Sequence, residues 1–317
     1  MWGDLVWRLR TVAEYRPDQA PPVKSWLVTI PDSRMNRHVD RATKTTGVFV
    51  VLALGFSVLY GLMVVLSQHG ILPFSMEHDV FWRKSLLGTI VWLVFSNFGP
   101  ALAAIIALAR CGGRADVDEL GRSLVRWRVP GGLYVLAWFG ILINAAVVII
   151  GYATRTLRFD ASAFSLVKFV LLYFVMIVLD GPLGEEIGWR GVLLPQLMKK
   201  RRPLSASVIV GVIWYAWHIP LYATDSRMNT PFEYILFLYQ CIALSVIFTW
   251  FFVKSGGSTL LMIYLHAASN YSTFLRFKLF PRVADSRATA LASAGVLLII
   301  ALAAGVSLVR EANTRQG

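Results

Sequence analysis

Charged residues and cysteines are scarce in this sequence, and several motifs of common soluble enzymes are missing. Only 15% of its 317 residues are charged and 56% are hydrophobic, a combination that is rare in a soluble domain. The two cysteines, Cys111 and Cys241, have no metal-ligand spacing, so we expect neither a disulfide nor thiol catalysis. The sequence contains no His-Glu-x-x-His motif, Gly-rich phosphate loop or serine nucleophile elbow.

Basic residues outnumber acidic ones and give a formal net charge of +13. They gather mainly between apolar runs, where anionic headgroups and the insertion machinery account for them. We therefore expect membrane lipids as partners of these charges and no nucleic acid.

Long apolar runs predict an all-α, polytopic membrane protein with about eight transmembrane helices around an intramembrane polar cavity. Crossing about 30 Å of hydrocarbon takes roughly 20 helical residues. Suitable runs lie near 46–67, 86–108, 131–151, 205–222, 232–253, 258–275 and 288–309. The region 161–196 is too long for one simple span, and Gly181, Pro182 and Gly184 predict a break there, with Asp180 as a helix cap.

The apolar runs divide the chain into three parts. Residues 1–45 form a basic arm, 46–310 a membrane domain with its motif-bearing core at about 160–275, and 311–317 a C-terminal tail. The arm has no apolar core of signal-peptide length, so we expect the first span to anchor the chain. The positive-inside rule favours a cytosolic N-terminus, and the composition favours a bacterial plasma membrane over the endoplasmic reticulum.

Glu185, Glu186 and Arg190 interrupt this apolar chain. A charge at the centre of a membrane helix costs roughly 3 kcal/mol on insertion scales, so these residues need a local reason. In a helix Glu186 and Arg190 share a face and can pair, while Glu185 lies about 100° round the axis. Glu186 and Arg190 either form only a structural ion pair or support Glu185 in chemistry.

Two histidines within apolar runs, His218 and His266, extend this polar set. Asn270 follows His266 by four residues and shares its helix face. Counted from basic residues on the cytosolic side, Glu185, His218 and His266 lie at depths of about 21, 24 and 18 Å. We therefore expect the three side chains and Asn270 to converge on one cavity. The nearby Trp189, Trp214 and Trp217 are interpreted as packing or interfacial aromatics.

These side chains suit the water-mediated cleavage of an amide. Glu185 and His218 can deprotonate water together, and His266 with Asn270 can stabilise the oxyanion. This mechanism needs no cofactor. Zinc held by Glu185, His218 and His266 is the alternative.

The motifs Glu185-Glu186-Ile-Gly-Trp-Arg190, Trp214 with His218, and His266 with Asn270 resemble, in order, those of the CPBP family. This family takes in type II CAAX prenyl endopeptidases and bacteriocin-processing enzymes. The resemblance covers about 160–275 and implies an intramembrane glutamate endopeptidase in which Glu185 and His218 activate water and His266 and Asn270 hold the oxyanion. Trp214 stands where Phe is common.

The expected substrate is a peptide or lipidated protein, with a prenylated CAAX-type protein among the candidates, because family members share a site and differ in substrate. Two other functions stay open. A non-catalytic membrane binding or immunity protein would use the same cavity to hold a peptide or lipid. A proton-coupled transporter would use the intramembrane carboxylates as a proton relay.

Overall fold

The structure is a computed structural model that describes residues 32–76, 85–155, 166–179, 181–222, 228–279 and 287–314. All regular elements in these ranges are helical, which confirms the predicted all-α class. The chain divides into two units, 1–38 and 39–317, and the second unit contains nearly all of the described residues. Asp180, residues 1–31 of the predicted arm and residues 315–317 of the tail lie outside the described residues.

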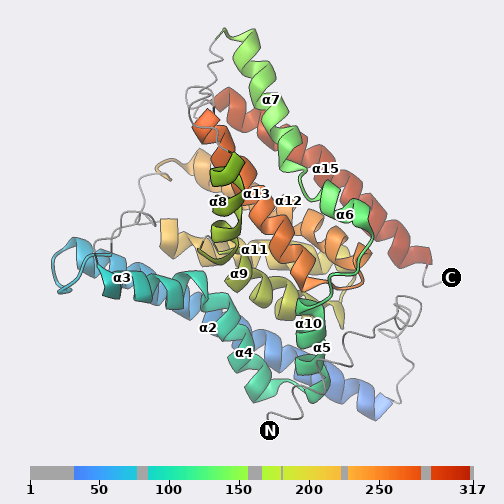
Figure 1. Ribbon diagram of the computed structural model, residues 1–317. Coiled ribbons are helices and arrows are strands. Elements are labelled where there is room, and N and C mark those ends of the chain that lie inside the picture. The colour runs from blue at the N-terminus through green and yellow to red at the C-terminus, as the bar shows by residue number, and fades with distance from the viewer. Residues whose placement is uncertain are drawn as a thin grey trace. The chain divides into compact units, whose positions relative to one another are not determined.

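The regular elements of the described ranges are α-helices and two π-helical segments (Figure 1). In chain order they are α2 (Asp32–Gln68), α3 (Leu86–Val91), η3 (Trp92–Asn97), α4 (Gly99–Cys111), α5 (Arg114–Leu124), α6 (Gly131–Leu136), α7 (Gly140–Ala153), α8 (Leu166–Leu179), α9 (Pro182–Gly188), η5 (Trp189–Leu193), α10 (Leu194–Met198), α11 (Pro203–Tyr222), α12 (Pro231–Lys254), α13 (Thr259–Leu279) and α15 (Arg287–Thr314).

Several helices are long and apolar enough to cross a membrane. In the described part of the chain there are five such helices: 39–68 in α2, 131–153 across α6 and α7, α11, α12 and α15. A sixth span arises if the bent pair 86–97 and 99–111, which meets at 56°, is counted as one. The predicted count of eight is not confirmed. In the described residues α8 has only 14 residues, and the 21-residue α13 carries polar residues along its length.

Helix α9 lies inside the second unit, among several other helices. Helix α9 packs against α4, α8 and α13, while α12 packs between α11 and α15. Helices α7 and α15 run side by side, and α7 also contacts α13 (Figure 1). Short α9 is therefore enclosed by longer helices, a position in which polar side chains are shielded from lipid.

Gly184 sets the distance between α9 and α4. A Cβ at this position would lie 2.1 Å from the carbonyl oxygen of Asn97 and 2.9 Å from the Cα of Phe98. Only glycine allows the two backbones to come this close, as small residues do where membrane helices pack. The approach fixes the position of the helical turn that carries Glu185 and Glu186.

A break separates α8 from α9, as the glycine and proline pattern predicted. Gly181 has a φ of +96°, a conformation that side-chain-bearing residues rarely adopt. Pro182 then starts α9, where its missing N–H leaves no bond unmade. The Gly181 carbonyl accepts the first backbone hydrogen bond of the new helix, from Glu185 N at 2.8 Å.

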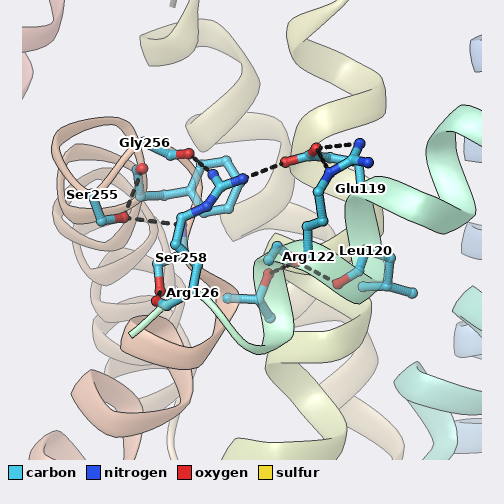
Figure 2. A network of polar contacts seen from close by, with 10 residues as sticks. Glu119, Leu120, Arg122, Arg126, Ser255, Gly256 and Ser258 are labelled. Carbon is cyan, nitrogen blue, oxygen red and sulfur yellow. Dashed lines mark hydrogen bonds and ion pairs between the residues drawn. The ribbon is translucent and has the colours of Figure 1, made fainter. Parts of the chain in front are cut away.

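A polar network ties the segment after α5 to the turn between α12 and α13 (Figure 2). The Arg126 guanidinium lies between the Gly256 carbonyl and the Glu119 carboxylate and donates to both. Ser258 Oγ donates to the Arg126 carbonyl at 2.6 Å. The network fastens α5 to the start of α13.

Helix α5 also contacts the segments that follow α9. It packs on η5, and Lys199 donates to Asp116 Oδ1 at 2.5 Å. Burial alone would raise the pKa of Asp116, but Lys199 and the Gly113 N–H lower it, and the net pKa lies below the usual 3.8. An ionised Asp116 therefore joins α5 to the end of α10.

Candidate active site

Glu186 and Arg190 form a fully buried ion pair. Both side chains have 0% exposure, and Arg190 Nη1 donates to Glu186 Oε1 at 2.8 Å. The four-residue spacing places them on one helix face, as the sequence predicted. The guanidinium also lies 4.9 Å from the Trp214 ring centroid and 4.5 Å from that of Phe248. These ring faces stabilise a cation that is removed from water.

Glu186 also contacts His266. The His266 Nδ1 lies 2.8 Å from Glu186 Oε1, the oxygen that Arg190 holds. A carboxylate paired with a guanidinium is an acceptor, so His266 Nδ1 carries the proton and donates it. Glu186 therefore fixes both the orientation of the His266 ring and the nitrogen, Nε2, that is directed elsewhere.

Glu185, one residue earlier, is hydrogen-bonded by two tryptophans. Its Oε2 accepts from Trp214 Nε1 at 2.6 Å and from Trp189 Nε1 at 3.3 Å. The residue is 6% exposed, slightly more open than the fully buried Glu186. The two adjacent carboxylates therefore differ, because a guanidinium and an imidazole hold Glu186 whereas two indole N–H groups hold Glu185.

His218 follows Trp214 by one turn of α11. Its Nδ1 lies 2.8 Å from the Trp214 carbonyl oxygen. A carbonyl only accepts, so His218 Nδ1 carries a proton and Nε2 of the neutral ring has a free lone pair. The ring stacks on Tyr222 with centroids 5.5 Å apart and meets Phe237 edge-on at 5.1 Å. Aromatic neighbours thus fix the plane of the imidazole.

Trp214 lies at the centre of the predicted set. Its ring centroid is 5.6 Å from that of His218 and 5.5 Å from that of His266. Its indole N–H donates to Glu185 Oε2 at 2.6 Å. The structure therefore brings Glu185, His218 and His266 together from α9, α11 and α13, as their matching depths predicted.

Asn270 lies one turn after His266 on α13 and is partly buried. It keeps the register that the sequence predicted, on the helix face that carries His266. Its side-chain amide carries two N–H donors.

The residues that zinc would require do not group as metal ligands. Across the described ranges, no three His, Cys, Asp or Glu side chains lie where they could hold a metal ion. The zinc alternative, with Glu185, His218 and His266 as ligands, stays a prediction that a chelator can test. Each of the three also directs a polar atom to a protein partner. Glu185 Oε2 accepts from two indoles, His218 Nδ1 faces the Trp214 carbonyl, and His266 Nδ1 faces Glu186.

Sequence reasoning missed the tryptophans as hydrogen-bond donors. Trp189 and Trp214 are 0% and 4% exposed, so neither is interfacial. The i,i+4 spacing of Glu185 and Trp189 was an available signal, since it places the indole on the face of the carboxylate. No comparable signal links Glu185 with Trp214, 29 residues away. Trp217 is a packing residue, 5.9 Å from the Trp189 ring.

The fold and the buried cluster define a class of protein, an α-helical membrane protein with paired carboxylates and imidazoles in its interior. The family model of type II CAAX prenyl endopeptidase Rce1-like proteins matches residues 167–272. This range carries all six predicted site residues. This match supports the family that the ordered motifs predicted.

A curated protein agrees with this family. CAAX prenyl protease 2 of Methanococcus maripaludis is 29% identical to this chain over 125 residues, which are 38% of this chain and 44% of that protein. The chain thus spans less than half the length of this relative.

Proposed function

We propose that this chain is an intramembrane endopeptidase that hydrolyses a peptide bond in a hydrophobic or lipidated substrate. The main support is that Glu185, His218 and His266 all lie next to Trp214. These residues lie within the region that matches the Rce1-like family model. The site is an integral part of a multi-pass membrane protein, with the N-terminus proposed to be cytosolic. A prenylated CAAX-type protein is the proposed substrate class, on the strength of the relative's name.

The proposed first step activates water. Glu185 and the Nε2 lone pair of His218 take a proton from water while its oxygen attacks the carbonyl carbon of the scissile bond. His218 can accept this proton because its Nδ1–H is already committed to the Trp214 carbonyl. The proton then passes to the amine as the carbon–nitrogen bond breaks, which leaves a free carboxylate and a free amine.

The oxyanion needs donors at the moment the carbonyl carbon becomes tetrahedral. We assign this role to His266 Nε2 and the Asn270 amide. His266 Nδ1–H is directed at Glu186, so donation from Nε2 requires a doubly protonated ring. Glu186 supplies the balancing negative charge, and Arg190 pairs with that carboxylate and fixes its position. The ion pair thus supports the oxyanion site.

The test is cleavage of farnesylated and unmodified CAAX peptides by protein in liposomes. We expect Glu185→Gln and His218→Ala each to lower kcat by at least about 100-fold, the size of a lost general base. The matched control is Glu119→Gln, which makes the same carboxylate-to-amide change in the α5 network and should keep wild-type activity. Parallel reactions with a zinc chelator should run at the same rate.

Three outcomes would contradict the proposal. If Glu185→Gln keeps an activity within a few-fold of wild type, Glu185 is not the general base. Inhibition by the chelator would indicate that the reaction depends on a metal ion. Peptide binding without cleavage by wild-type protein would favour a non-catalytic binding or immunity protein. A preference between the two peptide sets decides whether the substrate is prenylated.

A further inference from the structure

The two indole N–H groups on Glu185 converge on one oxygen. Trp214 Nε1 and Trp189 Nε1 lie 2.6 and 3.3 Å from Oε2. We propose that Trp214 and Trp189 are positioning residues that hold the Glu185 carboxylate so that Oε1 faces the attacking water. This inference rests on the proposed function and adds to it the residues that orient the general base, Glu185.

The donors reach Oε2 from two different elements. Trp189 opens η5, one helical turn after Glu185, and Trp214 belongs to α11. The terminal torsion of a glutamate is broad and has no strong preference of its own. Two donors from separate directions remove that freedom, and they use both lone pairs of Oε2.

The other oxygen lies beside a residue with no side chain. A Cβ at Gly181 would lie 2.4 Å from Glu185 Oε1. In the described part of the chain, every hydrogen bond to this carboxylate goes to Oε2. Gly181 therefore leaves Oε1 unobstructed at a point where any side chain would collide with it.

The indoles are themselves fixed by their neighbours. Trp189 meets Phe49 edge-on at 5.4 Å and is fully buried. Trp214 lies under the Arg190 guanidinium at 4.9 Å. Because their neighbours hold these indoles rigidly, the N–H groups fix the position of the Glu185 carboxylate. A mobile donor would instead move with the carboxylate.

The kinetic test removes the N–H and keeps an aromatic ring. Trp214→Phe should lower kcat about 10-fold, the value of a hydrogen bond to a charged group, with KM changed less than about twofold. Trp189→Phe should lower kcat less, because its bond is longer. The matched control is Trp250→Phe, which loses an indole donor 3.0 Å from Ser307 Oγ, between α12 and α15. It should keep the wild-type kcat.

A second test needs no substrate and therefore separates this inference from the proposed function. Thermal unfolding is measured for Trp214→Phe alone, Glu185→Ala alone and the double variant. A bond between the two residues predicts that Trp214→Phe lowers the midpoint in the wild-type background and has a clearly smaller effect once Glu185 is alanine.

The two tests fail in different ways. A wild-type protein that cleaves nothing, with non-additive unfolding midpoints, would overturn the proposed function and keep the indole contact. Additive midpoints, or a Trp214→Phe kcat equal to that of Trp250→Phe, would overturn the positioning role. A KM increase with unchanged kcat would also overturn it, since that result marks a substrate-binding residue.

Discussion

Two glutamate–arginine pairs in this protein have almost the same nitrogen–oxygen distance and opposite surroundings. Glu186–Arg190 in the site and Glu119–Arg122 on α5 are joined at 2.8 and 2.9 Å. The Arg190 side chain has 0% exposure, whereas that of Arg122 has 56%. Distance therefore says little about what each pair does. Burial makes the first pair indispensable, because neither partner can turn to water when the other is lost.

Breaking the buried pair should have the largest effect. Arg190→Met leaves Glu186 charged and buried, and should lower the free energy of unfolding by about 3–5 kcal/mol. Thermal unfolding in detergent micelles measures the loss, and Arg122→Met is the exposed control, expected to change stability by less than about 1 kcal/mol. The double variant Glu186→Gln with Arg190→Met should recover part of the loss. A double variant as unstable as the sum of the single ones would contradict this account.

The arginine that closes the α5 network should have an intermediate effect. Arg126 donates to the Gly256 carbonyl and to Glu119, and its side chain has 19% exposure. Arg126→Met should therefore lower the free energy of unfolding by about 1 kcal/mol, between the values for Arg190 and Arg122. Thermal unfolding under the same conditions gives the order. A loss equal to that of Arg190→Met would show that burial does not decide the difference.

The smallest effect should come from pH at the Asp116–Lys199 contact. The folded pKa of Asp116 lies below its usual value of 3.8, so the ionised carboxylate stabilises the fold above that value. This stabilisation is lost as pH falls through the folded pKa, and it amounts to at most about 1 kcal/mol because the pair is partly exposed. Between about pH 6 and pH 3, the midpoint temperature of unfolding should fall less steeply for Lys199→Met than for the wild-type protein. Identical slopes would remove Lys199 as the cause.

Local periodicity predicted much of the site. The spacing of Glu186 and Arg190 gave their ion pair, and Gly181 with Pro182 gave the break between α8 and α9. Helical rise alone placed Glu185, His218 and His266 at a common depth. These features depend on geometry within one segment or on the thickness of the bilayer, and both can be read from one sequence.

Contacts between segments could not be predicted in the same way. The bond from Trp214 to Glu185 and that from Ser258 to Arg126 depend on how helices pack, which periodicity does not determine. The span count also exceeded the five or six helices that qualify among the described residues. Helix α13 shows the reason, since the polar side chains that build the site lower the apolarity of the helix that carries them.

The partnership of Glu186 with His266 spans 80 residues and orders the assembly of the protein in time. A chain emerges from the ribosome N-terminus first, so Glu186 emerges ahead of α13. Arg190 follows within one turn and pairs with the carboxylate, whereas His266 arrives only with α13. The helical turn that contains Glu186 therefore also contains its counter-ion, Arg190, before His266 is in place. The same ion pair remains in the folded protein.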